Sequence, residues 1–458
     1  MESIWKHNLE MPKTEALDKE KRVHTVIIGA GMTGILTAYL LKQCGIDSII
    51  LEAKTIGSGQ TENTTAKITS QHDLIYDKLL HKTTFRRAKA YAMANQEAIR
   101  IYEQIIRKEH IDCDFEKKPA FLYTEKAENV ESLQKEAVAA KTLGIDAGFV
   151  DRLDNDDLPF DIKGAVCFQN QAQFHPLKFI KHLVNSLEIY ENTKDLAVKG
   201  HTVYTNMGNI RAENIVFACH YPITNVPGFY FLRQHQERSY VMALESQKEL
   251  LGIYYSVDEN GLSLRSAQNT LLLGGGAHRT GKCMCQCSDV EKENYGYAFL
   301  KKMADKYYQD SKEITHWSAQ DCMPHDEIPF IGKYSVFRPY WYVATGFKKW
   351  GMTSAMVSAM ILSNKICEKA NPYETAFSPQ RFLIRAGIKN FFTDLGESIM
   401  GLTKGIFQDK EHRCAHMGCS LVWNNEEDTW DCPCHGSRFS RNGELLDNPA
   451  QIDLTQKK

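Results

Sequence analysis

The chain has 458 residues, of which 43% are hydrophobic and 24% charged, and its formal net charge is -2. A chain of this length exceeds one ordinary hydrophobic core, so two or three globular domains are expected. The small net charge gives no general attraction to nucleic acid or anionic lipid, which leaves small-molecule chemistry as the working interpretation.

The N-terminus is too polar for a targeting segment. Residues 1–22, MESIWKHNLEMPKTEALDKEKR, lack the apolar core of a signal peptide. The longest apolar run, Val26 to Leu41, is interrupted by glycines, so neither a membrane span nor membrane association is expected. We predict a cytoplasmic protein whose 13 cysteines are mostly free thiols, because that compartment is reducing.

A dinucleotide-binding pattern follows this N-terminal arm. The segment VHTVIIGAGMTGILTAYLLKQCGIDSIILEA predicts a strand, a glycine turn, a helix and a second strand, at Val23 to Ile28, Ile35 to Leu41 and Ser48 to Leu51. Gly29 permits the tight turn, Gly31 lets backbone approach a pyrophosphate, and Gly34 lets the helix pack closely. Glu52, about 20 residues further on, is placed to accept hydrogen bonds from a ribose. The pattern fits FAD and NAD equally.

Two further segments suit the same nucleotide. TIGSGQTENTTAKITSQHDLIY, from Thr55 to Tyr76, is rich in small and hydroxyl residues that suit a loop around phosphates and a flavin edge. Near the other end, a predicted strand from Tyr340 to Thr345 is followed by a helix that begins at Gly351. A helix N-terminus aimed at a flavin would stabilise the negative charge gained on reduction.

Together, GAGMTG, GSGQTENTTAKITSQH, FACHYP, GGGAHRTGK and YVATGFKKWGMT resemble FAD-dependent oxidoreductases of the D-amino-acid oxidase and glycine oxidase type, over residues 23 to about 380. The resemblance implies an α/β (α+β) fold, with a doubly wound FAD-binding domain and an inserted antiparallel-sheet substrate domain. It also implies FAD contacts from a set of residues spread along the chain: Gly29, Gly31, Gly34, Glu52, Gly59, Thr61, Thr64, Thr65, Ala218, Gly346, Gly351, Met352 and Thr353.

The segments HQERSYVMAL and GGGAHRTGK line the substrate face in folds of this kind. Their candidates for substrate contact are Arg238, Ser239, Tyr240, His278 and Arg279, with surface or structural roles as the alternative. An arginine there could hold a substrate carboxylate through two parallel hydrogen bonds. No catalytic side chain is assigned, because this chemistry depends mainly on positioning a carbon–hydrogen bond over the flavin. A second GxGxxG unit is missing, which favours an organic substrate over a nicotinamide as electron source.

The patterns in the middle of the chain mainly predict structural elements. Residues 83–109 have the periodicity of an amphipathic helix. Cys283, Cys285 and Cys287 would share one face of an extended segment, but no fourth ligand is spaced nearby, so unligated thiols are predicted.

The stretch CAHMGCSLVWNNEEDTWDCPCHGS, residues 414–437, holds four cysteines and two histidines. A tetrahedral zinc site would accept two thiolates and two imidazoles, but it leaves Cys419 and Cys434 without a role. A cofactor-free disulfide knot is another alternative. In a Rieske [2Fe-2S] centre, two cysteines hold one iron and two histidines hold the other.

CAHMGC and CPCHGS resemble the two ligand loops of Rieske proteins. The resemblance implies cluster ligands Cys414, His416, Cys432 and His435, and a disulfide between Cys419 and Cys434. By position, Ser437 would donate a hydrogen bond to a cluster sulfur and Pro449 would belong to the loop that covers the cluster. Phe439 stands where many high-potential members have a tyrosine, so we expect a lower potential than in respiratory-chain Rieske proteins.

The predicted domains are an arm (1–22), an FAD-dependent oxidoreductase (23–372), a linker with an amphipathic helix (373–407) and a small all-β Rieske module (408–458), with the substrate domain mainly at about 80–160 and 221–320. The linker helix is expected to dock on the FAD domain, with a membrane-surface or partner helix as the alternative. The module lacks the strands that usually precede the first ligand loop. It must therefore gain stability from the FAD domain or the metal.

A flavin takes two electrons as a hydride, whereas a Rieske cluster carries one. We interpret the protein as an FAD-dependent dehydrogenase that oxidises a small amine or amino acid and passes electrons singly through the [2Fe-2S] cluster to an external one-electron acceptor. Two alternatives stay open: a flavin reductase fed through the cluster by an external donor, and a redox sensor or electron-transfer protein that turns over no metabolite.

Overall fold

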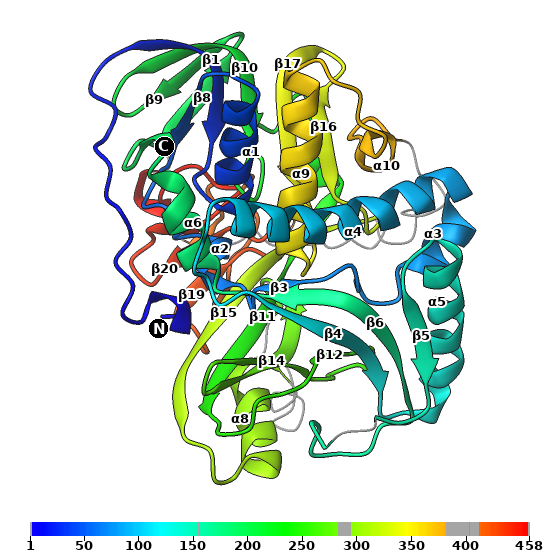
Figure 1. The fold of residues 1–458 in the computed structure, drawn as a ribbon. Helices are drawn as coiled ribbons and strands as arrows, with labels where there is room; N and C mark the ends of the chain where they lie inside the picture. Colours follow the sequence, from blue (N-terminus) through cyan, green and yellow to red (C-terminus); the bar gives the residue numbers. More distant parts are fainter. Residues whose placement is uncertain (1, 154–155, 283–294, 382–402, 404–411, 457–458) are drawn as a thin grey trace.

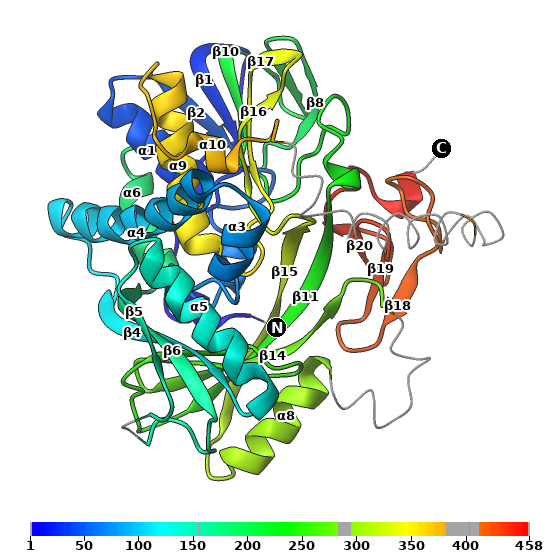
Figure 2. The same ribbon diagram turned by 90° about the vertical axis from the view of Figure 1, so that its right-hand side faces the viewer.

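The structure is a computed structural model of the chain and describes residues 2–153, 156–282, 295–381, 403 and 412–456. Two large sheets form the body of the molecule and a third, small sheet lies at one side (Figures 1 and 2). Within the described residues, no helix is long and apolar enough to cross a membrane. The predicted linker helix and Cys283, Cys285 and Cys287 lie outside the described residues.

The first sheet has eight strands, with β16-β17-β10-β1-β2-β7 in order; β9 also pairs with β10, and β8 pairs with β9. Neighbours from β17 to β7 run parallel, and β16 and β9 are antiparallel additions. The strands are β1 (Lys21–Ile28), β2 (Ser48–Leu51), β7 (Glu188–Tyr190), β8 (Asp195–Lys199), β9 (Thr202–Thr205), β10 (Asn209–Phe217), β16 (Phe330–Ser335) and β17 (Arg338–Thr345). Helices cover a parallel sheet, so β1 ends in the buried run Val26, Ile27 and Ile28.

Two helices of this domain begin at the carboxyl ends of strands. Helix α1 (Met32–Gln43) follows β1, and α9 (Gly351–Ile366) follows β17; the two helices pack against each other (Figure 1). The predicted strand–turn–helix–strand unit and the predicted strand before Gly346 are confirmed. Ligands of doubly wound folds bind at this edge of the sheet, where the helix N-termini also lie.

The second sheet has nine strands, with β15-β11-β14-β13-β12-β4-β6-β3 in order and β5 beside β6. Its pairs are antiparallel except for β12 with β4. The strands are β3 (Lys67–Ile68), β4 (Glu116–Thr124), β5 (Ala147–Val150), β6 (Gly164–Gln173), β11 (Gln234–Glu245), β12 (Ile253–Ser256), β13 (Ser263–Ala267), β14 (Thr270–Arg279) and β15 (Glu313–Pro324). Because β7–β10 of the first sheet separate β6 from β11, the chain passes repeatedly between the sheets. The predicted fold class is confirmed, and the exact domain limits stay a prediction.

Helices surround the two sheets. The predicted amphipathic helix at 83–109 is α4 (Phe85–Lys108), which buries one side, including Tyr91, Ile99 and Tyr102, and packs against α9. The other helices are α2 (Gln60–Asn63), α3 (Tyr76–Lys82), α5 (Val130–Thr142), α6 (Pro176–Val184), α8 (Gly296–Tyr307) and α10 (Glu374–Phe377).

The N-terminal arm is packed more closely than its polar sequence indicates. Trp5 is buried, and its indole nitrogen donates to the carbonyl of Thr64 at 2.7 Å. The guanidinium of Arg265 lies over the indole, 5.3 Å from the ring centroid. The arm therefore supports the segment predicted to surround the flavin.

The C-terminal module (described residues 412–456) contains a four-stranded antiparallel sheet of β18 (Val422–Asn424), β19 (Thr429–Asp431), β20 (Arg438–Ser440) and β21 (Leu445–Asp447). Its buried cluster consists of the four module cysteines with Leu421, Phe439 and Ala450. So small a core provides little stability alone. The module lies against β11 and β15 of the second sheet (Figure 2), and hydrogen bonds join it to both strands.

Candidate functional site

A cavity of about 660 Å³ lies where the carboxyl ends of the first sheet meet the second sheet. Its volume is typical of a site for a small molecule or cofactor. Its wall includes the glycine turn after β1, the loop that follows β2, the second sheet, the start of α9, and the C-terminal module through Arg438, Leu446, Asp447, Asn448 and Gln451.

The turn after β1 has the close contacts that a nucleotide-binding turn requires. Gly29 has a φ of +109°, and a Cβ placed on it would lie 2.7 Å from the carbonyl oxygen of Ala218. A Cβ on Gly34 would lie 2.0 Å from the carbonyl oxygen of Gly29, so only glycine lets α1 pack this closely on the turn. Gly31 caps the N-terminus of α1 and lines the cavity. The turn thus fits a dinucleotide phosphate.

Glu52 is held at the end of β2. Its two carboxylate oxygens accept hydrogen bonds from the backbone N–H groups of Ala30 and Lys54, both at 2.9 Å. Burial raises the pKa of Glu52, and these hydrogen bonds partly oppose the rise. The side chain lines the cavity, and its remaining lone pairs are available to a ribose hydroxyl.

Most residues predicted to contact FAD line this cavity; the exceptions are Gly34, Gly346 and Thr353. Gly346 has a φ of +76°, and a Cβ there would lie 2.5 Å from Cγ of Pro324. The hydroxyl of Thr353 donates to the carbonyl of Thr69 at 3.0 Å. Gly346 and Thr353 therefore contact other residues of the protein and do not line the cavity. The individual FAD contacts stay a prediction.

The substrate-face candidates divide into two groups. Ser239 and Tyr240 line the cavity, and the hydroxyl of Tyr240 lies 2.9 Å from Nε2 of His278. Because Nδ1 of His278 lies 2.9 Å from the carbonyl oxygen of Arg279, this nitrogen carries the proton and Nε2 accepts from Tyr240. Burial lowers the pKa of His278, which keeps the ring neutral.

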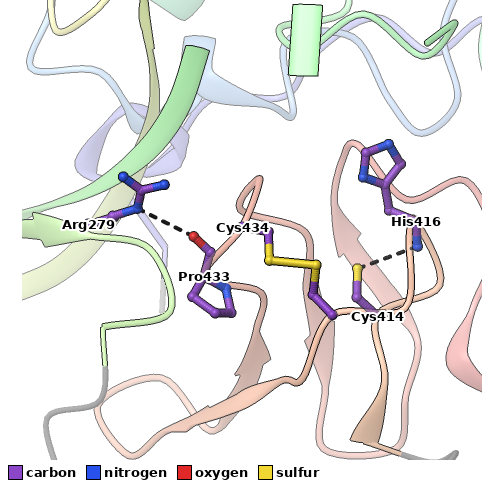
Figure 3. Close-up of a disulfide and its surroundings, with 6 residues drawn as sticks. Arg279, Cys414, His416, Pro433 and Cys434 are labelled. Atoms are coloured by element: carbon purple, nitrogen blue, oxygen red, sulfur yellow. Dashed lines mark hydrogen bonds between the residues drawn. A yellow bond between two sulfur atoms is a disulfide. The ribbon is translucent and has the colours of Figure 1, made fainter. Parts of the chain in front are cut away.

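Arg238 and Arg279 do not line the cavity. Arg238 forms an ion pair with Glu427 of the C-terminal module, and Nε of Arg279 donates to the carbonyl of Pro433 at 3.3 Å (Figure 3). The structure thus places both arginines at the contact with the module, away from the position of a substrate clamp.

Ionisable residues that sequence reasoning did not single out also line the cavity. Lys349 lies 3.4 Å from Glu237, and burial raises the pKa of Asp321 to about 7. In the sequence, Lys67 interrupts a run of small and hydroxyl residues. This interruption is the one local signal that could have identified Lys67 as a site residue. The side-chain oxygen Oδ2 of Asp195 is buried without a hydrogen-bond partner among the described residues. The cavity therefore has more titratable groups than its motifs indicate.

The two cysteine–histidine loops of the C-terminal module have the same backbone geometry. The N–H of Gly418 donates to the carbonyl of Cys414, and the N–H of Gly436 donates to the carbonyl of Cys432, both at 2.9 Å. Both glycines have a φ of +85°, a conformation that L side chains rarely adopt. A disulfide between Cys419 and Cys434 joins the loops (Figure 3).

The predicted ligands converge between these loops. The buried thiols of Cys414 and Cys432 are hydrogen-bonded to each other, and the imidazole centroids of His416 and His435 lie 5.0 Å apart. Nδ1 of His416 is buried with no hydrogen-bond partner among the described residues, as expected of a nitrogen that binds metal. Two thiols with two imidazoles are the donor set of a Rieske cluster. The residues present fit that group.

Neighbouring residues complete this centre. The hydroxyl of Ser437 hydrogen-bonds the thiol of Cys414 and accepts from the N–H of Ala450 at 3.0 Å, which ties the Pro449 loop to the ligands. Phe439 is fully buried in the same cluster. Nε2 of His416 lies 3.0 Å from Oδ1 of Asn225, a residue of the oxidoreductase part of the chain.

Comparison with known families agrees with both halves of this geometry. Residues 24–365 match the family described as FAD dependent oxidoreductase, and residues 398–457 match the Rieske [2Fe-2S] domain. The chain belongs to the FAD dependent oxidoreductases. Its oxidoreductase domain binds FAD, and its C-terminal Rieske domain binds a [2Fe-2S] cluster.

Known relatives share the whole arrangement or only parts of it. YhfW of Bacillus subtilis (strain 168), whose name describes a Rieske 2Fe-2S iron-sulfur protein, is 34% identical over 99% of this chain and 98% of its own. A cytochrome b6-f complex iron-sulfur subunit of Cyanophora paradoxa is 44% identical over only 41 residues, which are 9% of this chain and 17% of that subunit.

Solved structures share the fold of the oxidoreductase. Glycine oxidase from Geobacillus kaustophilus superposes with a TM-score of 0.64 at 15% identity, over 79% of this chain and 99% of its own. L-amino acid deaminase from Proteus vulgaris gives 0.64 at 17% identity, over 82% of this chain and 98% of its own. At these identities the likeness shows the fold alone.

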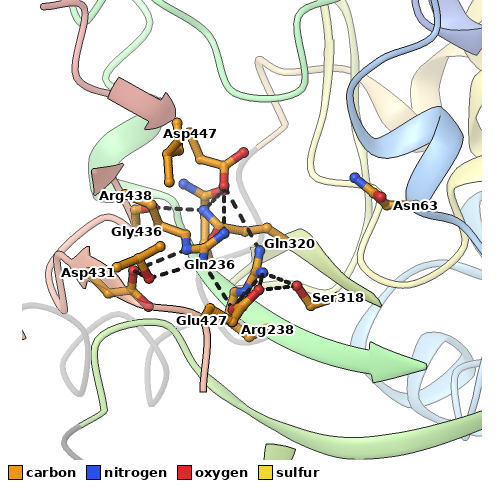
Figure 4. A network of polar contacts seen from close by, with 12 residues as sticks. Asn63, Gln236, Arg238, Ser318, Gln320, Glu427, Asp431, Gly436, Arg438 and Asp447 are labelled. Atoms are coloured by element: carbon orange, nitrogen blue, oxygen red, sulfur yellow. Dashed lines mark hydrogen bonds and ion pairs between the residues drawn. The ribbon is translucent and has the colours of Figure 1, made fainter. Parts of the chain in front are cut away.

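The second Rieske ligand loop of this FAD dependent oxidoreductase is hydrogen-bonded to its second sheet. The side-chain amide of Gln236 on β11 donates to the carbonyls of His435 and Asn448, at 2.8 and 2.9 Å. Gln320 on β15 donates to the carbonyl of Gly436 at 2.7 Å and to Oε1 of Gln236 at 2.8 Å (Figure 4). The second ligand loop is thus fixed to the sheet through its backbone.

A buried ionic network lies beside these amides. Nε of Arg238 lies 3.0 Å from Glu427, and Arg438 pairs with Glu427, Asp431 and Asp447 at 3.0 Å each (Figure 4). Burial alone would raise the pKa of Glu427, but Arg238 and Arg438 outweigh it and lower the pKa to about 2. The network joins the two domains by charge as well as by hydrogen bonds.

Proposed function

We propose that the protein is an FAD-dependent dehydrogenase that oxidises a small amine or amino acid and passes the electrons one at a time through the Rieske cluster to an external one-electron acceptor. FAD supplies the capacity to accept a hydride, and the cluster supplies single-electron transfer. The observation that carries the proposal is that the C-terminal module forms part of the wall of the FAD cavity.

A short chain of hydrogen bonds supports electron transfer between the two centres. His220 lines the cavity, and its Nε2 lies 3.3 Å from Oε1 of Gln236. Gln236 in turn donates to the carbonyl of His435, a predicted cluster ligand. Two side chains thus separate the cavity from the ligand loop. This arrangement favours a fixed path over a path that requires the module to move.

The cavity supports an amine or amino-acid substrate. Tyr255 and Trp350 provide aromatic surface, and Lys67, Lys349 and Asp321 provide charge or hydrogen bonds. This mixture is typical of pockets for small polar substrates. The named structural neighbours, glycine oxidase and L-amino acid deaminase, point to the same substrate class for the proposal.

The proposal is tested by mixing the anaerobic holoenzyme with a panel of amines and amino acids. One compound class should bleach the flavin, and the electron paramagnetic resonance signal of the reduced cluster should then grow without added reductant. If no compound bleaches the flavin, while a reduced cluster passes electrons to it, the protein is a reductase.

Two variants test the role of the cluster. His435→Ala removes a predicted ligand, and we expect it to abolish turnover with a one-electron acceptor such as ferricyanide while the flavin still bleaches. His412→Ala is the matched control, because this ring packs on Trp430 in the same module and is not a predicted ligand. Fast turnover with oxygen that His435→Ala leaves unchanged would show that the cluster is not on the path.

A further inference from the structure

Lys67 is a buried lysine that faces the FAD cavity. It lies on the short edge strand β3, is 9% exposed, and lines the cavity. Its ammonium nitrogen donates to the hydroxyl of Ser263 and lies 5.8 Å from the ring centroid of Tyr255. No carboxylate among the described residues forms an ion pair with it. A lysine in such a site loses its hydration without gaining a counter-charge.

Arg265 fixes the segment that carries Lys67. Its Nη1 donates to the carbonyls of Thr65 and Ala66, both at 2.8 Å, and its Nε donates to the carbonyl of Ser266 at 3.1 Å. Burial, and then the positive charge of Arg265, lower the pKa of Lys67 to about 7. The lysine can therefore exchange a proton near neutral pH.

Carboxylates near Lys67 do not pair with it among the described residues: Glu116 accepts a hydrogen bond from Gln173, and Asp258 and Asp321 line other parts of the cavity wall. On β6 the strand partner of Lys67 is the neutral Gln173, and on β12 the phenol of Tyr255 faces the amine. Helix α9, which packs on β3, has Lys365 in its last turn as its one ionisable residue. The low pKa thus follows from the site as a whole.

Another lysine that lines the cavity, Lys349, has a pKa shifted in the opposite direction. Lys349 lies 3.4 Å from Glu237, and although burial opposes it, Tyr255, Glu237 and Asp321 raise the pKa of Lys349. It stays a cation at neutral pH. Of these two cavity lysines, Lys67 is the one suited to accept a proton.

We propose that Lys67 is a catalytic residue whose neutral amine accepts the proton that the ammonium group of the substrate must lose before oxidation. This inference rests on the proposed function and deepens it. An ammonium nitrogen has no lone pair to stabilise the positive charge that develops as its α-carbon loses a hydride. Deprotonation supplies that lone pair.

The step balances in protons and electrons. The substrate R₂CH–NH₃⁺ gives one proton to Nζ of Lys67, which leaves R₂CH–NH₂ and a lysine ammonium. The α-carbon then loses a hydride, two electrons with one proton, to the FAD of the proposed function. The product is the iminium R₂C=NH₂⁺. Lys67 releases its proton to solvent when the product leaves and water enters the cavity.

The first test compares wild type with Lys67→Met and Lys67→Arg by anaerobic stopped-flow measurement of flavin reduction at saturating substrate. Wild type should lose rate as the pH falls below about 7, and both variants should be slower at pH 7 by about 10² or more. In Lys67→Met the remaining rate of flavin reduction should rise only at alkaline pH, as the pH approaches the pKa of the ammonium group of the free substrate. Added imidazole should partly restore Lys67→Met, a response that a purely structural role would not give.

The second test needs no turnover. The pH dependence of acylation of Lys67 in the holoenzyme, quantified by mass spectrometry of its peptide, should have its midpoint near 7. A midpoint near that of ordinary surface lysines overturns the inference, as does a Lys67→Met variant that contains FAD and keeps the wild-type rate and pH profile. If no amine or amino acid bleaches the wild-type flavin, the proposed function fails, and this role fails with it.

Discussion

Phe439 is predicted, from the resemblance to Rieske proteins, to occupy the position at which many high-potential members have a tyrosine. It is fully buried beside the cluster cysteines and offers no hydroxyl to the cluster. We predict that Phe439→Tyr raises the midpoint potential by roughly 20 to 60 mV, which corresponds to one added hydrogen bond in a one-electron couple. The measurement is a redox titration followed by electron paramagnetic resonance.

Phe439→Leu is the matched control, because it changes the packing and adds no hydroxyl. Its potential should stay near that of wild type. An equal shift in both variants would assign the effect to packing and would contradict the hydrogen-bond explanation.

Glu427 is the carboxylate shared by two buried arginines, Arg238 and Arg438. We predict that Glu427→Gln lowers the stability of the C-terminal module by about 3 kcal/mol, because two buried guanidinium groups lose a common counter-charge. Urea unfolding followed by loss of the visible absorbance of the cluster measures this change.

The adjacent Asp428 provides the control. Its ion pair with Arg441 is 2.9 Å long, but both side chains are mostly exposed, so Asp428→Asn should change the unfolding curve little. Equal losses in the two variants would mean that the buried network does not hold the module.

For individual residues, the sequence predicts those sites whose members lie close together in the chain. The GxGxxG turn and the cysteine–histidine loops are contiguous motifs, and the structure brings the members of each together. The role of Arg238 could not be predicted in this way, because its partner Glu427 lies 189 residues away and on another domain. Lys67 was missed because its low pKa depends first on burial in the fold and then on Arg265, which is distant in sequence.

At the element scale, Gly281 marks the contact between the second sheet and the second ligand loop. It has a φ of +76°, and a Cβ there would lie 2.4 Å from the backbone nitrogen of Pro433. Because backbone atoms cannot rotate aside, we predict that Gly281→Ala displaces the loop and slows electron transfer from flavin to cluster several-fold. Stopped-flow absorbance after anaerobic substrate reduction follows this transfer.

Gly45 is the control position that distinguishes the steric clash at Gly281 from backbone strain. Its φ of +73° is nearly the same, but nothing lies within 4 Å of its Cβ position. Both alanine variants should lose roughly 1 kcal/mol or more of stability to the left-handed conformation, and only Gly281→Ala should slow the transfer. A normal transfer rate in Gly281→Ala would show that this contact is not needed.

Elements with strong periodicity were predictable, and elements defined by tertiary contacts were not. The 83–109 helix and the strands around the glycine turn follow from apolar spacing alone. The two-residue strand β3 has no periodicity to detect, yet it carries Lys67. The N-terminal arm shows no apolar pattern, and only the structure reveals Trp5 against Thr64.

In the whole molecule, the short Rieske module is stabilised by contacts with the oxidoreductase domain. The sequence predicted that such a module must lean on the FAD domain or the metal. The structure shows the contact: Gln236 and Gln320 hold the second ligand loop, and Arg238 enters the ionic network. The module in turn forms part of the wall of the FAD cavity.

The docking of the module should therefore depend on pH. The pKa of Glu427 is lowered to about 2 in the folded protein, against 4.5 for an ordinary glutamate. Its contribution to stability is fully present above about pH 4.5 and is lost as the pH falls through 2. In the oxidoreductase the shifts oppose each other: burial raises the pKa of Asp321 to about 7, so acidification favours the folded state through that group, whereas Lys349 and His235 outweigh burial and lower the pKa of Glu237 to about 2. We predict that the module separates before the oxidoreductase unfolds.

Small-angle X-ray scattering and circular dichroism over the same acid titration distinguish the two events. The radius of gyration should rise between about pH 4.5 and 2 while the circular dichroism of the large sheets is retained. In Glu427→Gln the group that titrates is missing, so the same rise should be smaller or should already be present at pH 6. A single transition in both signals, identical in wild type and Glu427→Gln, would mean that the ionic network does not control docking and that the amide contacts of Gln236 and Gln320 are sufficient.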